Sequence, residues 1–403
     1  MPYSAEETAG FVTRRPATYD GVVLAAPFST PYQRYSIDTA HLWIARALKG
    51  SLDAAGLRKD RLDGFSVSSF TLFPDTAVGL TQHLGVAPRW LDHVPMGGAS
   101  AGVALRRAAR AVQAGDVDIV ACVAGDTNHI DSFRQLLSSF SRFAMDASYP
   151  YGYGGPNANF ALLTDRYMHE YGATRADFGK ICVAQRDNAL RNPRAVMKKP
   201  LRLDQYLDAR PIADPIALFD CVMPCAGAEC FLVMQEDEAT RLGIPFARLT
   251  AAIERHNAHG DDPIQLRGGW TRDRDTLWDM AGCAPQDIDV MQTYDDYPVI
   301  VMMQFEDLGL CAKGEGVDFV RQHDLTITGS FPHNTSGGQL AAGQAGAAGG
   351  FIGMVEAIRQ GTGQADGTQV KDARRALVSG FGMINYDRGL CSSAAVLETG
   401  VLA

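Results

Sequence analysis

The sequence contains no run of about 18 consecutive apolar residues, which is the length that a membrane-spanning helix requires. Its first 21 residues, MPYSAEETAGFVTRRPATYDG, are polar and mixed in charge, so they lack the apolar core of a secretory signal peptide. Hydrophobic residues make up 46% of the chain and charged residues 21%, as in ordinary globular proteins. We therefore expect a cytoplasmic protein that does not insert into a membrane.

The chain also has fewer basic than acidic residues. The 37 Lys and Arg residues face 46 Asp and Glu residues, which gives a formal net charge of −9. This balance argues against nucleic-acid binding, which favours a basic face, although a local basic pocket would still be able to bind an anion. The chain contains no Walker loop and no dinucleotide-binding fingerprint. We expect no tightly bound cofactor.

The eight cysteines do not form a metal-binding pattern. Cys221 and Cys225 are separated by three residues and Cys230 follows them, but no His/Cys pair completes a zinc site. His256 and His259 likewise have no third ligand nearby in the sequence. Buried, reduced thiols in a cytoplasmic protein are the expectation, with no metal site.

Two stretches of the chain share one pattern. LDAAGLRKDRLDGFSVSS begins at Leu52, and LWDMAGCAPQDIDVMQTY begins at Leu277. Each has an Ala-Gly pair suited to end a helix, then a polar loop, then Leu-Asp or Ile-Asp, and then an apolar strand. A duplicated unit therefore predicts two similar halves.

A second pair of stretches follows in the same order. Residues 97–123 predict a glycine turn, a helix and a strand, and residues 336–361 predict another small-residue turn and helix, followed by the strand RRALVSGFG. Strands that alternate with helices predict an α/β protein whose parallel sheets are covered by helices.

The middle of the chain fits neither copy. It contains aromatic loops, a helix and the basic stretch RNPRAVMKKPLR. We therefore divide the chain into a first half formed by residues 1–126 and 239–250, a loop insertion at 127–238, and a second half at 251–403.

Several stretches resemble motifs of the thiolase superfamily, above all its sterol-carrier-protein-type thiolases and lipid-transfer-protein relatives. RYMHEYGATRADFGKICVAQRDNALRNPRA resembles the family's insertion segment, and RPIADPIALFDCVMPCAGAECFLV resembles its IADPL…CCPxSDGAAA segment. YDDYPVIVMMQFEDLGLCAKGEG is similar to HDCFxxxExxxYExLGLCxxGEG, and NTSGGQLAAGQAGAAG is similar to NPSGGxxxxGHPxGATG. The resemblance implies a thiolase fold: two βαβαβαββ halves in a five-layer αβαβα arrangement, with the loop insertion in the first half.

The same resemblance places the active site where the N-termini of two central helices meet, and there this chain departs from the family. The nucleophilic cysteine falls on Ala99, with Ser100 beside it, and the histidine of the GHP motif falls on Gln344. The histidine and cysteine of the HDCF motif fall on Tyr294 and Asp296. Classical cysteine-dependent thiolysis is therefore not expected.

Relatives that cleave steroid side chains by retro-aldol chemistry also lack the cysteine. They carry tyrosine at the position of Tyr294, and also where this chain has Gln344. The resemblance thus implies an acyl-CoA enzyme that breaks or forms a C–C bond by an aldol route. Tyr294 would take the hydroxyl proton, assisted by Asp296, and the turn at Ala99 and Ser100, together with Gln344, would hold the enolate.

Two other functions stay open. One is an acyltransferase that uses Ser100 or Cys391, which lies near the place of the family's second catalytic cysteine. The other is a non-catalytic acyl-CoA-binding subunit of a complex. Asn334 is a candidate to hold a water or an oxyanion, or else a turn-forming residue, and His333 either acts as a base or packs at a strand end.

Coenzyme A is expected only as part of the substrate. Its phosphates would meet the basic stretch, although surface basic residues need no function; the candidates are Arg191, Arg194, Lys198 and Lys199. Two partners are implied by the resemblance alone: a second copy of the chain in a homodimer, and a small protein with an OB-fold and a zinc ribbon.

Overall fold

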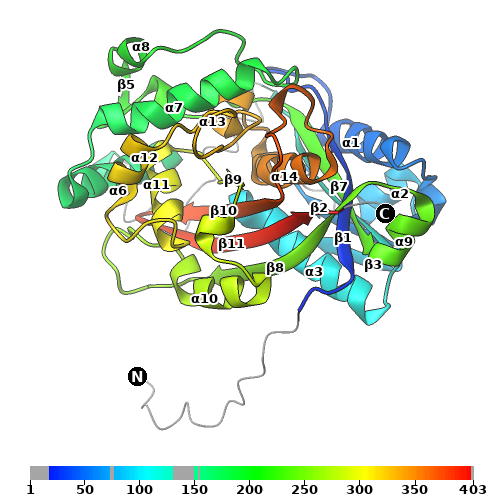
Figure 1. Ribbon diagram of the computed structural model, residues 1–403. Helices are drawn as coiled ribbons and strands as arrows, with labels where there is room; N and C mark the ends of the chain where they lie inside the picture. The colour runs from blue at the N-terminus through cyan, green and yellow to red at the C-terminus, as the bar shows by residue number, and fades with distance from the viewer. Residues whose placement is uncertain (1–17, 73–76, 130–148, 153–154, 401–403) are drawn as a thin grey trace, which may run out of the picture.

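A computed structural model describes residues 18–72, 77–129, 149–152 and 155–400 of the chain. Within these residues, nine strands form one mixed sheet in the order β3-β2-β4-β7-β1-β8-β11-β10-β9 (Figure 1). Their bounds are Val22–Ser29 (β1), Gly64–Ser68 (β2), Trp90–His93 (β3), Ile119–Asp126 (β4), Gly227–Gln235 (β7), Phe246–His256 (β8), Val290–Gln292 (β9), Arg375–Asn385 (β10) and Arg388–Thr399 (β11). Strands β5 (Pro211–Ala213) and β6 (Ile216–Ala217) pair separately.

The order of the strands confirms the duplication. Outward from the junction of β1 and β8, the first half runs β1-β7-β4-β2 and the second half runs β8-β11-β10-β9. In each half the first two of these pairings are antiparallel and the third is parallel. The expectation of parallel sheets therefore holds only for the outer strands, because the last strand of each half, β7 or β11, runs antiparallel to both of its neighbours.

The repeated Leu-Asp and Ile-Asp pairs have the same role in both halves. The Asp63 carboxylate, just before β2, accepts hydrogen bonds from the backbone N–H groups of Asp118 and Ile119, where β4 begins. Asp289, just before β9, accepts hydrogen bonds from the N–H groups of Arg374 and Arg375, where β10 begins. In each half this carboxylate fixes the start of the neighbouring parallel strand.

Twelve helices lie in the described part of the chain. Their bounds are Ala40–Ala54 (α1), Ala77–Leu84 (α2), Ser100–Ala114 (α3), Pro156–Tyr171 (α6), Arg175–Leu190 (α7), Leu203–Leu207 (α8), Glu236–Leu242 (α9), Trp270–Ala281 (α10), Pro298–Asp307 (α11), Gly316–Gln322 (α12), Gly338–Ala342 (α13) and Ile352–Thr362 (α14). None of them is both long and apolar enough to cross a bilayer.

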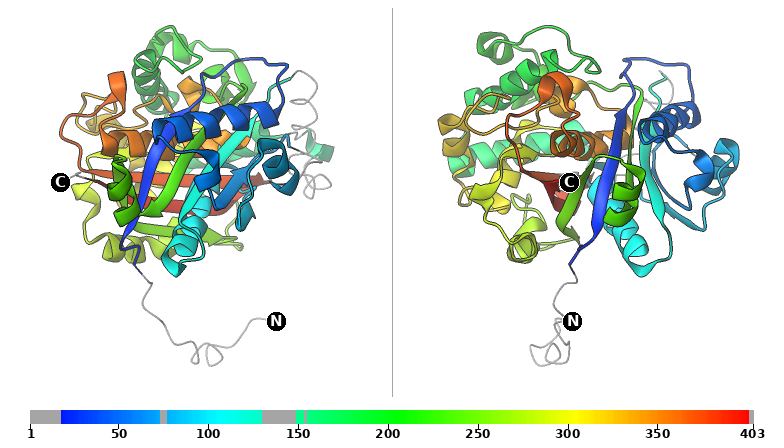
Figure 2. Two further views of the ribbon diagram at one scale, coloured as in Figure 1. Left: turned by 90° about the vertical axis from the view of Figure 1, so that its right-hand side faces the viewer. Right: turned by 45° about the vertical axis from the view of Figure 1, so that its right-hand side comes forward.

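Alternation along the strands produces the expected five layers. In β4, Val120 and Cys122 join the apolar cluster around the central helices α3 and α14, whereas Ile119 and Ala121 join the cluster under α1 and α2. In β10, Val378 faces the central cluster and its neighbour Leu377 faces the cluster under α7, α11 and α12. The right-hand view of Figure 2 shows the outer helices of the first half (blue) and of the insertion and second half (green to yellow) on opposite sides.

The structure moves two of the expected boundaries. Strand β7 pairs with both β4 and β1, so residues 227–235 lie within the sheet of the first half and not in a loop insertion that reaches 238. Strand β8 crosses the expected boundary at 250 and opens the second half. The sequence did not predict β7 as a strand of this sheet, because the strand is buried on both faces and its apolar run lacks the alternation of a half-buried strand.

Candidate active site

The turn before α3 is small because three other segments pack against it. A Cβ atom on Gly98 would overlap the ring of Tyr294 and the carbonyl oxygen of Phe381 in β10. A Cβ atom on Gly350, in the turn before α14, would lie 2.6 Å from the carbonyl oxygen of Gly97. The two small-residue turns that precede the central helices therefore meet each other, and Tyr294 lies against the first of them.

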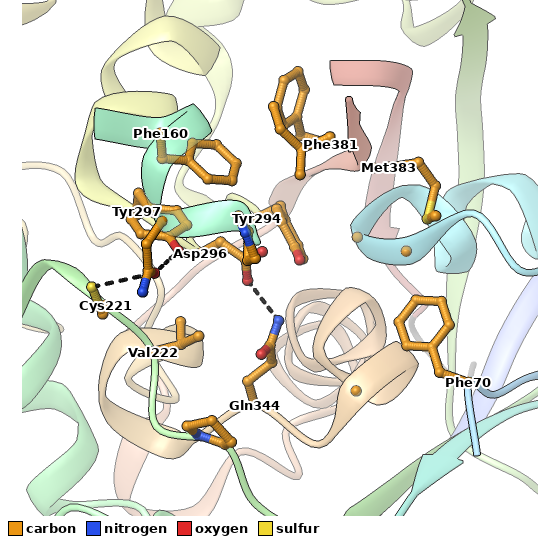
Figure 3. A pocket seen from close by; sticks show the side chains of 18 residues that line it. Phe70, Phe160, Cys221, Val222, Tyr294, Asp296, Tyr297, Gln344, Phe381 and Met383 are labelled. Carbon is orange, nitrogen blue, oxygen red and sulfur yellow. Dashed lines mark hydrogen bonds between the residues drawn. The ribbon is translucent and has the colours of Figure 1, made fainter. Parts of the chain in front are cut away.

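A cavity of about 270 Å³ opens at this meeting point (Figure 3). This volume is just below the usual range for small-molecule pockets, roughly 300–1,000 Å³. The wall combines backbone of the turn at Gly97 and Gly98 with side chains from both halves and from the insertion. Its apolar side chains include Phe70, Phe160, Val222, Phe381, Met383 and Ile384, and its polar ones are Asn157, Cys221, Tyr294, Asp296, Tyr297 and Gln344.

The structure brings Tyr294, Asp296 and Gln344 together at this cavity, as the sequence predicted. The Nε2 group of Gln344 donates a hydrogen bond to Oδ1 of Asp296 at 2.9 Å. The backbone N–H of Tyr294 donates to the carbonyl oxygen of Ser379 at 3.0 Å, and its carbonyl oxygen accepts from Nε2 of Gln304 at 2.7 Å. Both Tyr294 and the Asp296–Gln344 pair are thus held in place before any ligand binds.

The backbone of Gln344 is equally constrained. Its N–H donates to the carbonyl oxygen of Met223 at 2.9 Å, and its own carbonyl oxygen accepts from the N–H of Cys225 at 2.8 Å. Residues 223–225 come from the end of the insertion, so a segment distant in sequence fixes the position of the Gln344 amide at the cavity wall.

Burial determines the protonation of the two ionisable groups. It raises the pKa of Asp296 to about 7, and the nearby charge of Asp295 acts in the same direction, while hydrogen bonding to the Tyr294 hydroxyl partly offsets this rise. Burial, followed by the charge of Asp296, raises the pKa of Tyr294 well above its usual value. At neutral pH Tyr294 is therefore a proton donor, and Asp296 is the member of the pair able to accept a proton.

Ala99 and Ser100 do not line the cavity. Ser100 is fully buried, and its hydroxyl donates to the carbonyl oxygen of Val94 and accepts from the N–H of Met96, both at 3.0 Å. Ala99 lies behind the turn, where its carbonyl oxygen accepts from the Ser393 hydroxyl. The cavity wall that we expected from Ala99 is formed by Gly97 and Gly98, because the turn presents its backbone to the cavity one residue earlier.

Cys391 is also outside the cavity. It lies in β11, paired with Gly382 and His256, and only 2% of its surface is exposed. Burial raises the pKa of its thiol to about 12, so it stays protonated, whereas the thiolate is the nucleophilic form. The alternative in which Cys391 is the nucleophile therefore gains no support from its position, which is in a strand and not in a loop at the cavity.

Asn334 and His333 both contact Thr293. Asn334 adopts a left-handed backbone conformation with φ of 42°, and its Oδ1 accepts a hydrogen bond from the N–H of Thr293 at 2.8 Å. This geometry fits the turn-forming alternative, and Asn334 does not line the cavity at the glycine turn. A ring nitrogen of the fully buried His333 lies 2.8 Å from the Thr293 hydroxyl, and burial lowers the pKa of this histidine to about 3.

The basic residues of the insertion lie away from the cavity. Arg191, Lys198 and Lys199 are exposed, and Nζ of Lys198 donates to the carbonyl oxygen of Pro193 at 2.9 Å. Arg194 is half-buried and lies 3.9 Å from the carboxylate of Asp366. Any contact of these basic residues with coenzyme A would therefore be on the outer surface of the protein, and this contact stays a prediction.

Three further polar residues, Asn157, Cys221 and Tyr297, share one end of the cavity, and nothing in the sequence grouped them together. Tyr297 belongs to the YDDY stretch already singled out, but nothing in the sequence paired it with the insertion. None of the described histidines lines the cavity. Within residues 18–72, 77–129, 149–152 and 155–400, no group of three or more His, Cys, Asp or Glu side chains is arranged to hold a metal ion.

Comparisons with known proteins agree with this architecture. Residues 256–396 match the family model described as thiolase C-terminal domain-like. The chain is 31% identical over 336 residues to a steroid side-chain-cleaving aldolase of Thermomonospora curvata, covering 78% of this chain and 83% of the relative. It is 30% identical to the 17-hydroxy-3-oxo-4-pregnene-20-carboxyl-CoA lyase of Mycobacterium tuberculosis, covering 81% and 86% of the two chains.

Solved structures give the same result. The Ltp2-ChsH2(DUF35) aldolase superposes with a TM-score of 0.80 at 26% identity, covering 94% of this chain and 98% of the other. Human mitochondrial 3-ketoacyl-CoA thiolase superposes with a TM-score of 0.68 at 14% identity, covering 96% of this chain and 100% of the other, which shows the shared fold. The chain therefore belongs to the thiolase superfamily, in the branch of the sterol-carrier-protein-type thiolases and their aldolase relatives.

Proposed function

We propose that this protein is an acyl-CoA lyase of the aldolase type, which breaks or forms the bond between the α and β carbons of a β-hydroxyacyl-CoA. The observation that carries the proposal is the Tyr294–Asp296–Gln344 group at a cavity where the thiolase nucleophile is absent. The relatives named as aldolase and CoA lyase support the same reaction class.

In the cleavage direction, the substrate hydroxyl gives its proton to the oxygen of Tyr294 while the Tyr294 proton passes to the carboxylate of Asp296. The Cα–Cβ bond then breaks, which leaves a carbonyl product and the enolate of the CoA thioester. Asp296 returns the proton through Tyr294 to the α carbon. This relay, in place of Tyr294 alone, follows from the raised pKa of Tyr294, since a phenol that is protonated at neutral pH cannot start as the base.

The turn at Gly97 and Gly98 is the proposed site of the thioester oxygen. It lines the cavity directly before the N-terminus of α3, where the helix dipole favours negative charge. An enolate oxygen held there would lower the energy of the transition state.

Substitution of Tyr294 tests the reaction. Tyr294→Phe keeps the ring that packs on Gly98 but removes the hydroxyl, so turnover of a β-hydroxyacyl-CoA should fall by roughly 10²–10⁴-fold. Binding of the same thioester, measured by calorimetry, should change little because the coenzyme A contacts are untouched. Turnover at the parental rate would make Tyr294 a packing residue and would overturn the proposed mechanism.

The acyltransferase alternative has less support. Ser100 and Cys391 are both buried away from the cavity, and the thiol that does line it, Cys221, has a pKa raised to about 12 by burial. An acyl-enzyme therefore lacks an activated nucleophile. A non-catalytic subunit has no need of a buried carboxylate and tyrosine held in register at a cavity, so we favour the enzyme.

We also propose a homodimer in the cytoplasm. Strand β3 ends the sheet of the first half with one edge unpaired by any described strand, and such an edge suits pairing with a second copy. All eight cysteines are free, as befits a reducing compartment. The name of the solved Ltp2-ChsH2(DUF35) aldolase joins two components, which supports the small partner protein expected here.

A further inference from the structure

One end of the cavity carries an amide group whose acceptor oxygen is already used. Oδ1 of Asn157 accepts a hydrogen bond from the Tyr297 hydroxyl at 2.5 Å, while the Cys221 thiol lies 3.8 Å from the same oxygen and 3.6 Å from the carbonyl oxygen of Ala217. No described residue accepts a hydrogen bond from Nδ2 of Asn157, although this residue lines the cavity. The bond from Tyr297 thus occupies Oδ1 and leaves the NH₂ group of the amide to donate to a ligand.

The orientation of this amide is fixed by packing. Asn157 lies in the first turn of α6, and Tyr297 directly precedes α11. The Tyr297 ring is buried and stacks on Phe160, also in α6, with ring centroids 4.0 Å apart. This packing holds the Tyr297 hydroxyl in place to donate to Oδ1. The NH₂ group is therefore already ordered before a ligand binds, and binding costs little side-chain entropy.

This end lies across the cavity from the glycine turn. A Cβ atom on Gly97 would come within 3.3 Å of Met383, and Figure 3 shows Met383 and Phe70 at one side of the cavity and Tyr297 and Cys221 at the other. Tyr294 and Asp296 appear between the two sides. A substrate with its thioester at the glycine turn and its β oxygen at Tyr294 would extend the rest of its acyl group toward Asn157.

We propose that Asn157 is a specificity-determining residue, which donates a hydrogen bond to a carbonyl oxygen on the part of the substrate beyond the β carbon. The substrate class is then a CoA thioester whose released fragment is apolar and carries a neutral acceptor oxygen at its far end. The apolar wall formed by Phe160 and Val222 excludes a charged group there, because burying an unpaired charge is costly. The orientation of the substrate rests on the proposed function.

The test uses pairs of thioesters that differ by one ring carbonyl. Suitable pairs are 3-hydroxy-3-(4-oxocyclohexyl)propanoyl-CoA with its cyclohexyl analogue, and the corresponding decalinone and decalin compounds. Calorimetry on the full chain gives Kd for each. In at least one of the two pairs, we expect the ketone to bind about ten- to hundredfold more tightly than its deoxo analogue. The reason is that a compound without the carbonyl leaves the buried N–H donor of the site unpaired.

Variants test whether this ratio of Kd values depends on Asn157. Asn157→Leu should bring it to about one, and Asn157→Asp, which keeps an acceptor for Tyr297 but loses the donor, should bring it to one or below. Met383→Leu, at the other side of the cavity, is the matched control and should leave the ratio unchanged. Thermal unfolding midpoints near that of the parent show that each variant is folded.

The outcomes separate the two proposals. An equal Kd for ketone and deoxo compounds in the parent, or a ratio that survives Asn157→Asp, would overturn the role of Asn157 even if the thioesters are cleaved. A ratio that depends on Asn157 without any cleavage would sustain the subsite and overturn the lyase. A chain that binds none of the four thioesters would overturn both.

Discussion

Asp296 has the properties that a proton acceptor needs at neutral pH. Its carboxylate is held by the Gln344 amide, and burial brings its pKa to about 7, close to the pH at which a general base works best. By the resemblance, Gln344 stands where the thiolase motif has a histidine, and its amide does not act as a base. In the proposed mechanism Gln344 orients Asp296 through this hydrogen bond.

The pH dependence of turnover follows from this pKa. The base must be ionised, so kcat/KM should rise about tenfold per pH unit below roughly pH 7 and level off above it. Asp296→Asn should abolish this limb together with most of the activity, at every pH tested. A profile that is flat from pH 5.5 to 8 in the parent would exclude Asp296 as the base.

Cys391 provides the opposite prediction. Because it is buried in β11, Cys391→Ala should keep turnover within about twofold, while the lost packing lowers the free energy of unfolding by about 1 kcal/mol. Denaturant titration and steady-state assays measure the two effects. Mass spectrometry of the intact protein after incubation with acetyl-CoA should detect no adduct, and one on Cys391 or Ser100 would revive the transferase.

At the scale of elements, the turn before α3 depends on the absence of a single Cβ atom. Gly98→Ala would push against the Tyr294 ring and the backbone of β10, so we expect turnover to fall at least tenfold and the unfolding midpoint to drop. Gly260→Ala is the matched control, because a Cβ atom there meets nothing within 4 Å. Parental activity in Gly98→Ala would mean that the turn tolerates a shift of Tyr294.

The repeated aspartates make a second prediction about elements. Asp63→Ala and Asp289→Ala each remove a carboxylate that accepts two backbone hydrogen bonds at the start of a strand. Each should lower the free energy of unfolding by about 1–2 kcal/mol, as measured by urea denaturation. If only one of them destabilises the protein, the two halves do not use the motif alike.

At the scale of the whole molecule, buried carboxyl groups set the pH dependence of stability. Burial raises the pKa of Glu229, Asp295 and Asp296 to about 7 and that of Asp307 to about 6. The unfolded chain loses these protons near pH 4, before the folded protein does, so the free energy of unfolding should decrease as the pH rises from about 4.5 to 7.

Calorimetric unfolding between pH 4.5 and 8 measures this decrease. Glu229→Gln should make it shallower, since glutamine cannot ionise and still offers an oxygen to the Tyr32 hydroxyl, which now donates to Glu229 at 2.9 Å. An unfolding midpoint that rises with pH over this range, or an unchanged slope in Glu229→Gln, would show that these carboxyl groups ionise in the folded protein as they do in water.

Local patterns in the sequence determined the duplicated halves and the small turn before α3, and the resemblance to the thiolase superfamily implied the loss of the nucleophile at Ala99 and the meeting of Tyr294 with Gln344. These depend on residues a few positions apart, or on motifs at the ends of elements that a known fold brings together. The sequence could not place β7 in the sheet, because a strand buried on both faces carries no period, and it could not tell buried from exposed for Ser100 and Cys391. Asn157 is 64 residues from Cys221 and 140 from Tyr297 in the chain. Only the packing of the insertion against the second half decided that these three residues share one wall, because local sequence patterns do not report contacts between side chains so far apart in the chain.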